Sequence, residues 1–322
     1  EMVLKGCTAA YDMFFQFPEP NLESISAVAQ GYTEIGIRAV IAPMMADTTF
    51  YRAIPGLLDS LPEPHRNHAA ALEAAPWEDH IAGCRALLQN WPTNRERVRP
   101  ALGPTLPMHC TDDFIRACRD LAKDYDIGLQ MHLGESKLQA VAGLKRYGKS
   151  LTAHLDSLGL IGPNFSGAHC IWLDDDDLGL LADRGAKVAH NPGSNLRLGN
   201  GVAPARRMLD AGVTLGIGTD GSSSGDHQNM VEAMRMAAFA SRLMELDPNG
   251  WLGSWDVLRA GTLGGAALLG MSGQIGHIAP GYKADIVFVD LTNVAFVPLN
   301  DAANQIVNCA DGSAIDSVMI GG

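Results

Sequence analysis

The chain has 322 residues, of which 47% are hydrophobic and 19% charged, and a formal net charge of −12 at pH 7. A chain of this length is typical of one large barrel with a small appendage, or of two ordinary domains. The net negative charge argues against a nucleic acid partner, and the sequence has no apolar run long enough to cross a membrane.

Short apolar segments alternate with helical patterns along most of the chain. In order they are predicted as strand 7–13, helix 22–34, strand 38–42, helix 77–90, strand 98–102, helix 112–125, strand 128–132, strand 166–169, helix 174–184, strand 187–190, helix 203–211, strand 214–218, and helices 229–246 and 255–269. Thr111 is in position to cap the helix at 112–125, and the acidic start of the helix at 174–184 suits the helix dipole. Strands that alternate with helices predict a parallel sheet.

The order of these elements indicates an α/β fold. It fits a (β/α)8 TIM-type barrel whose first strand is apparently missing, or a doubly wound sheet. The barrel is favoured because the candidate site residues follow the fourth, fifth and seventh predicted strands, which would lie too far apart in an open sheet. Residues 1–272 are predicted to form the barrel. Residues 273–322, with strands at 286–290 and 317–320, are predicted to form part of a small β-sandwich domain.

Two histidines and two carboxylates follow separate predicted strands. They are His132, Glu135, His169 and Asp220. Metal-assisted hydrolysis needs such a set, because it uses ligands, a proton shuttle and a base that orients water. Each residue alone has a structural alternative: a surface polar group for His132 or Glu135, a core histidine for His169, and an Asx turn for Asp220.

The phrase His-Asn-Pro-Gly-Ser-Asn at 190–195 follows the sixth predicted strand, where a barrel opens into its mouth. His190 is therefore a candidate for substrate binding. A structural turn, whose asparagine side chains bond the backbone, explains the phrase about equally well. The acidic run at 174–177 is interpreted as a solvated helix start rather than as a cation site.

Together the phrases at 131–136, 167–170, 188–201, 216–224 and 281–290 resemble the amidohydrolase superfamily. The similar branch holds guanine, cytosine, adenosine-type and pterin deaminases and the triazine hydrolases. The resemblance covers nearly the whole chain, and the motifs are highly specific in combination and in order. It implies a barrel with a β-sandwich built from both chain ends.

The resemblance also implies a role for each candidate residue. His132 would be a metal ligand, and Glu135 would carry a proton to the leaving nitrogen. His169, as a ligand or just outside the ligand shell, would polarise the attacked group and orient the water. Asp220 would be both metal ligand and general base. One divalent metal, zinc or sometimes iron, would hold a hydroxide that attacks an amidine-like ring carbon and expels ammonia.

The sequence departs from the family in one respect. The family takes two further ligands from a His-x-His phrase, but this sequence has none, and its first histidine is His65. We therefore expect a fragment that lacks residues at both ends. Because catalytic zinc sites use at least three protein ligands, this exact polypeptide is expected to be inactive or poorly active.

The leading hypothesis is an aminohydrolase that acts on C–N bonds of a purine, pterin, pyrimidine or triazine-like ring. The alternatives are a triazine-type chlorohydrolase and a non-catalytic barrel that persists as a binding protein. The predicted partner is a small heterocycle, with no nucleic acid or membrane, and a homodimer is possible. Six cysteines without a Cys-x-x-Cys pair predict a reducing cytoplasm. Specificity would come from loop residues, namely 14–20, 44–51, Trp172 and 222–227.

Overall fold

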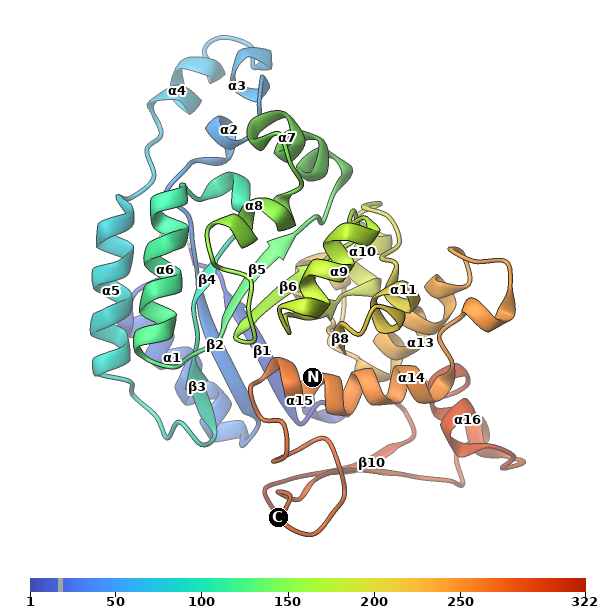
Figure 1. The fold of residues 1–322 in the computed structure, drawn as a ribbon. Helices are drawn as coiled ribbons and strands as arrows, with labels where there is room; N and C mark the ends of the chain where they lie inside the picture. The colour runs from blue at the N-terminus through green and yellow to red at the C-terminus, as the bar shows by residue number, and fades with distance from the viewer. Residues whose placement is uncertain (17–19) are drawn as a thin grey trace.

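The computed structural model describes residues 1–16 and 20–322 and is built around parallel strands (Figure 1). The strands are β1 (Ala9–Phe14), β2 (Arg38–Met45), β3 (Val98–Pro100), β4 (Gly103–Pro104), β5 (Leu129–Leu133), β6 (Phe165–His169), β7 (Lys187–His190) and β8 (Thr214–Ile217). One sheet has the order β1-β2-β3, with β4 also on β2, and a second has the order β5-β6-β7-β8. A parallel bridge between Leu102 and Leu129 joins them. This is the strand order expected of the predicted barrel.

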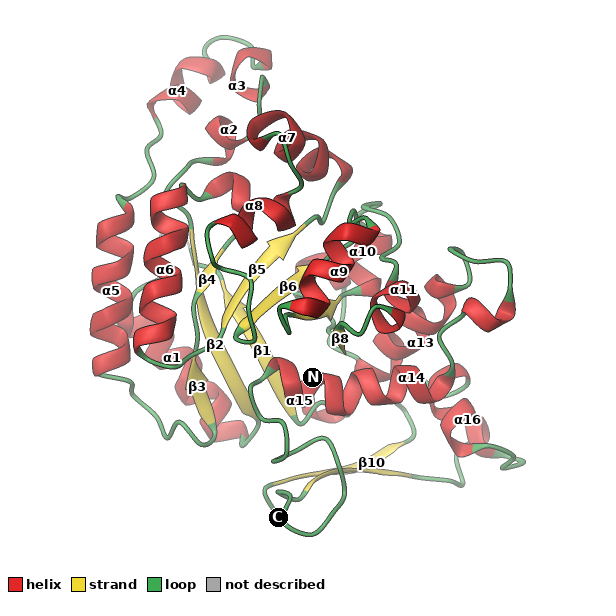
Figure 2. Ribbon diagram, viewed as in Figure 1, coloured by secondary structure: helices red, strands yellow, loops and turns green. Residues whose placement is uncertain are grey.

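Helices lie around these strands and beyond their ends (Figure 2). They are α1 (Leu22–Ile35), α2 (Phe50–Ala53), α3 (Leu57–Ser60), α4 (His65–Ala71), α5 (Trp77–Gln89), α6 (Asp112–Asp124), α7 (Lys137–Tyr147), α8 (Leu151–Ser157), α9 (Asp175–Asp183), α10 (Pro192–Arg197), α11 (Ala205–Asp210), α12 (Ser222–Gly225), α13 (Met230–Ser241), α14 (Ser254–Arg259), α15 (Gly265–Leu268) and α16 (Ala302–Asn308). Thr111 accepts a hydrogen bond from the Phe114 backbone as the predicted cap of α6. Asp174 and Asp177 form a capping box at α9, which confirms the helix start.

Among the predicted element boundaries that differ from the structure, two have identifiable reasons. The second strand does not end before Pro43, because β2 continues to Met45. Pro43 is tolerated because the neighbouring strand is interrupted there: pairing with β2 stops at Pro100 and resumes at Gly103. The predicted helix 229–246 ends as α13 at Ser241, whose buried hydroxyl accepts the Leu252 backbone N–H and helps to hold the returning chain.

The last barrel helix packs unusually close to β8. A π-helical turn, Ala260–Gly264, links α14 to α15. A Cβ atom placed on Gly264 would collide with the Leu215 carbonyl oxygen, whereas one placed on the adjacent Gly265 would meet no atom within 4 Å. Only glycine at position 264 therefore permits this approach of helix and strand.

Gly264→Ala is expected to destabilise the protein, because backbone atoms of β8 would have to move. We expect a loss of roughly 1–3 kcal/mol in the free energy of unfolding, measured by urea denaturation. Gly265→Ala is the matched control and should be neutral or stabilising, since alanine is the better helix former. Equal losses in both variants would contradict this account.

The tail of the chain returns to the barrel. Strands β9 (Asp285–Val289) and β10 (Ile315–Ile320) pair in antiparallel fashion, and α16 packs on α13 and α14. The domain boundary after residue 272 stays a prediction. Among the described residues, no helix has the length and apolar character needed to span a membrane.

Candidate functional site

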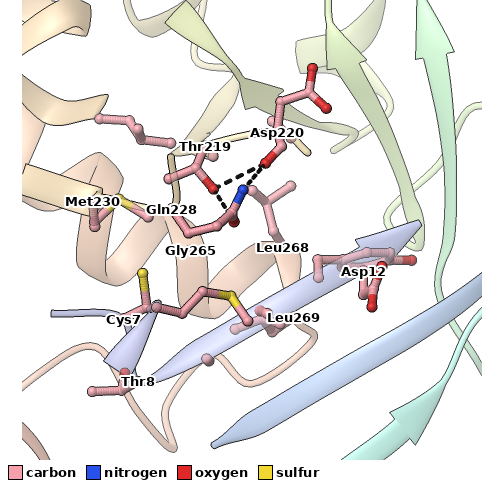
Figure 3. Close-up of a pocket in the computed structure, with 18 of the residues that line it drawn as sticks. Cys7, Thr8, Asp12, Thr219, Asp220, Gln228, Met230, Gly265, Leu268 and Leu269 are labelled. Atoms are coloured by element: carbon pink, nitrogen blue, oxygen red, sulfur yellow. Dashed lines mark hydrogen bonds between the residues drawn. The ribbon is translucent and has the colours of Figure 1, made fainter. Parts of the chain in front are cut away.

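A cavity of about 1120 Å³ borders β1, β8 and α15 and reaches the ends of β5 and β6. His132, His169 and Asp220 line it. Figure 3 shows Thr219, Asp220 and Gln228 together on one wall, with Asp12 of β1 on another. Three of the four predicted catalytic or metal-binding residues therefore border one space.

His132, in β5, presents a neutral imidazole to this space. Its Nδ1 lies 2.7 Å from the Thr105 carbonyl oxygen. A carbonyl oxygen only accepts, so Nδ1 carries the proton and Nε2 keeps a free lone pair. Burial, and the neighbouring His169, lower the pKa of His132. The side chain is therefore in the form that binds a metal.

His169, at the end of β6, lies beside His132 and both carboxylates. The two imidazole rings stack with centroids 5.4 Å apart. The Nε2 atom of His169 is 3.9 Å from an oxygen of Glu135 and 4.0 Å from an oxygen of Asp220. The structure thus brings together all four residues that the sequence indicated.

The backbone is strained at two of these positions. His169 and Asp220 have φ values of 68° and 60°, and Cys170, next to His169, has 51°. Residues other than glycine rarely adopt this left-handed backbone conformation. Those that do are concentrated at functional sites. The turns direct His169 and Asp220 toward the cavity.

Hydrogen bonds hold the Asp220 turn in place. Its carboxylate accepts the Gly221 backbone N–H at 2.6 Å, and its carbonyl oxygen accepts the Gln228 side-chain amide at 2.6 Å. Burial raises the pKa of Asp220, but hydrogen bonding to the carboxylate outweighs this and holds the pKa below its ordinary value. The carboxylate is thus kept ionised, as a ligand or base must be.

Glu135 is fixed by two amide side chains. Gln139 donates to one carboxylate oxygen at 3.2 Å, and Asn200 donates to the other at 3.1 Å. The Glu135 backbone N–H in turn donates to Gln139. Sequence patterns did not indicate these partners, although Asn200 lies in the phrase 188–201 that carries part of the family resemblance.

The segment after β7 is a short helix, α10, whereas a structural turn was one of the two interpretations of its sequence. Pro192 occupies its first turn, where the missing N–H costs nothing. His190, just before it, is only 1% exposed. Neither of its ring nitrogens has a hydrogen-bond partner among the described residues. Its role in substrate binding stays a prediction.

His190 is expected to make stability depend on pH. Burial, followed by the nearby His169, lowers its pKa to about 4. In the unfolded chain this ring takes up a proton as pH falls below about 6.5. In the folded chain it takes up the proton only near pH 4, so between these values protonation favours the unfolded state. The folded state should therefore lose up to about 3 kcal/mol between these values.

The test is urea denaturation of the wild type and His190→Leu from pH 4 to 7. The variant should show a shallower loss of stability as pH falls. His132, whose pKa is also lowered, should leave a residual slope in the same direction. Identical slopes in the two proteins would contradict this expectation.

The chemical types of the side chains at this site are those that bind a divalent metal. Two imidazoles and the Asp220 carboxylate face one cavity, and His132 has its Nε2 free. In the described part of the chain, however, no group of three or more His, Cys, Asp or Glu side chains is arranged to hold an ion. The assignment of His132 and Asp220 as metal ligands therefore stays a prediction.

The predicted specificity loops lie partly around the cavity. Phe15, Met44 and Ser222 line it. Residues 17–19, within the predicted loop 14–20, lie outside the described residues. Trp172 is 40% exposed, and its indole N–H donates to the Asn200 carbonyl oxygen. It therefore supports the segment that holds Glu135.

The amidohydrolase family model matches residues 1–322. A 5-methylthioadenosine/S-adenosylhomocysteine deaminase of Syntrophomonas wolfei is 32% identical over all of this chain and 67% of its own length. A 5'-deoxyadenosine deaminase of Methanopyrus kandleri is 30% identical with the same coverage. The chain spans about two thirds of the length of the curated relatives it matches.

Solved structures show the same likeness. An adenosine deaminase from Xanthomonas campestris with bound zinc has a TM-score of 0.84 and 29% identity, over 99% of this chain and 66% of that one. The zinc complex of the atrazine chlorohydrolase TrzN from Arthrobacter aurescens TC1 has a TM-score of 0.87 and 28% identity, over 99% and 68%.

Proposed function

Because the chain belongs to the amidohydrolase family, we propose that it is a metal-dependent hydrolase that deaminates a nitrogen heterocycle. Adenosine-type nucleosides are the first substrates to test, since relatives that match the whole chain are named as deaminases of such compounds. The reaction replaces a ring amino group by oxygen from water and releases ammonia.

The side chains divide the work of this reaction. His132 and Asp220 would hold a divalent metal, which supplies an activated water near neutral pH. Asp220 accepts a proton from the water, and Glu135 delivers a proton to the leaving nitrogen. His169, between the two carboxylates, orients the attacked group. We favour zinc, because the zinc-bound structures named above are similar over 99% of this chain.

One observation carries the proposal. His169 Nε2 lies within 4.0 Å of both Glu135 and Asp220, although the three residues come from the ends of different strands. A proton relay needs this arrangement, because it requires an acid and a base near the same reacting atom.

The test is ammonia release from a panel of heterocycles after incubation of the protein with zinc. The panel should include adenosine, 5'-deoxyadenosine, guanine and a triazine. Elemental analysis of the wild type and Asp220→Asn shows whether a metal binds at this site. No metal and no turnover in the wild type would contradict the proposal for this polypeptide. That result would agree with the poor activity expected from the missing His-x-His ligands and with the non-catalytic barrel.

A triazine-type chlorohydrolase is the second candidate function. It is favoured by the TM-score of 0.87 with the atrazine chlorohydrolase. The same water chemistry would expel chloride instead of ammonia. Chloride release from atrazine, without ammonia release from any nucleoside, would select this alternative.

The remaining assignments are less specific. We propose a cytoplasmic location, which is supported by six cysteines that are all free thiols, five of them buried. A homodimer stays a prediction, and its test is the molecular mass measured by light scattering.

A further inference from the structure

A ten-residue segment after β7 brings three asparagines to three parts of the candidate site. Asn191 packs against Gly218 at the end of β8, where an added Cβ atom would collide with the asparagine Oδ1. Asn195 lies against His169, and Asn200 lies against Glu135. The segment thus touches the ends of all three strands that carry the proposed catalytic groups.

Asn195 makes the most buried of these contacts. Its Oδ1 lies 2.8 Å from Nδ1 of His169, and the two residues are 1% and 2% exposed. Because the bond is shielded from water, few other partners are available to Nδ1. The bond therefore fixes the orientation of the ring strongly. The opposite ring nitrogen, Nε2, is the atom that faces Glu135 and Asp220.

The backbone of α10 holds Asn195 itself. Its N–H donates to the Asn191 carbonyl oxygen at 3.0 Å, and its own carbonyl oxygen accepts the Asn200 N–H at 2.9 Å. The Asn200 carbonyl is in turn held by Trp172. The three asparagines are therefore linked, and a shift of one would move the others.

We propose that Asn195 is a positioning residue that keeps the His169 proton on Nδ1 and leaves the Nε2 lone pair directed at the reaction site. An amide oxygen only accepts, so it selects the Nδ1–H tautomer. With the proton on Nε2 instead, His169 could neither accept a proton there nor bind a metal. The catalytic meaning of this tautomer rests on the proposed function, but the tautomer itself does not.

Two substitutions distinguish whether the Asn195 side chain accepts a hydrogen bond from His169 or donates one to it. Asn195→Asp keeps an oxygen that accepts from Nδ1–H, whereas Asn195→Leu removes the acceptor at similar size. If the amide were turned the other way, its NH2 group would donate to Nδ1 and force the Nε2–H tautomer. The aspartate variant, whose carboxylate only accepts, would then change the tautomer from Nε2–H to Nδ1–H, whereas the first orientation predicts no change in that variant.

The measurement is 15N NMR of the histidine side chains in metal-free, chelator-treated protein. It is recorded at about pH 8.5, well above the ordinary pKa of imidazole. His169→Gln identifies the His169 signals. We expect the Nδ1–H tautomer in the wild type and in Asn195→Asp, and a tautomer mixture or Nε2–H in Asn195→Leu. Leu196→Ala, on the exposed side of α10, is the control and should match the wild type.

An Nε2–H tautomer in the wild type, or an unchanged tautomer in Asn195→Leu, would overturn the proposal. These outcomes do not depend on turnover, so they are distinguishable from failure of the proposed function. Where substrate turnover is measured, Asn195→Leu should lower kcat about 10–100-fold with little change in KM, and Asn195→Asp should retain most of the activity. A loss confined to KM would also contradict a positioning role.

Discussion

Glu135→Gln is expected to lower kcat by roughly 10²–10⁴-fold without changing the metal content of the protein. Glutamine keeps the size of the side chain and can still accept a hydrogen bond from Gln139 or from Asn200, but it cannot release a proton to the leaving nitrogen. Asp220→Asn should lose both activity and metal, because that carboxylate is proposed as ligand and base. The measurements are ammonia release and elemental analysis on the same samples.

The contrast between the two variants tests the division of roles. Asp113→Asn is the control, since this carboxylate lies on α6, outside the candidate site, and is 76% exposed. It should retain metal and activity. If Glu135→Gln lost metal as well, Glu135 would be a ligand rather than a proton shuttle.

The sequence predicted the family, the class of fold and the class of enzyme, and all three are confirmed by relatives that are deaminases or triazine hydrolases. The prediction succeeded because a parallel barrel gathers the carboxyl ends of its strands in one place. Short polar phrases after apolar runs, such as those of His132 and His169, can therefore be placed without knowledge of side-chain contacts.

Sequence patterns could not predict the residues that hold these groups. Thr105 and Asn195 contact His132 and His169 only because different βα units pack together. Gln139 lies four residues after Glu135, and its contact depends on where α7 begins. Local patterns also failed where tertiary contacts decide. The predicted helix 229–246 ends at Ser241, where the chain turns back, and Leu243 and Leu246 beyond this end are exposed.

Asp285→Ala is expected to cost about 3–5 kcal/mol in the free energy of unfolding. Asp285, in β9, makes a two-pronged ion pair with Arg38 of β2, at 2.6 and 3.0 Å. The side chains are 2% and 5% exposed, so removal of the carboxylate leaves a buried, unpaired guanidinium. The Gly321 backbone N–H also donates to Asp285, so the variant should loosen the attachment of β10.

Urea denaturation of three variants tests this expectation. The control is Asp210→Ala, which breaks an exposed pair with Arg206, the two side chains being 58% and 30% exposed. That change should cost no more than about 1 kcal/mol. The double variant Arg38→Met/Asp285→Leu should recover much of the loss, because it removes both charges and leaves apolar groups of similar size. If Asp285→Ala were no more costly than Asp210→Ala, the ion pair would not anchor the tail to the barrel.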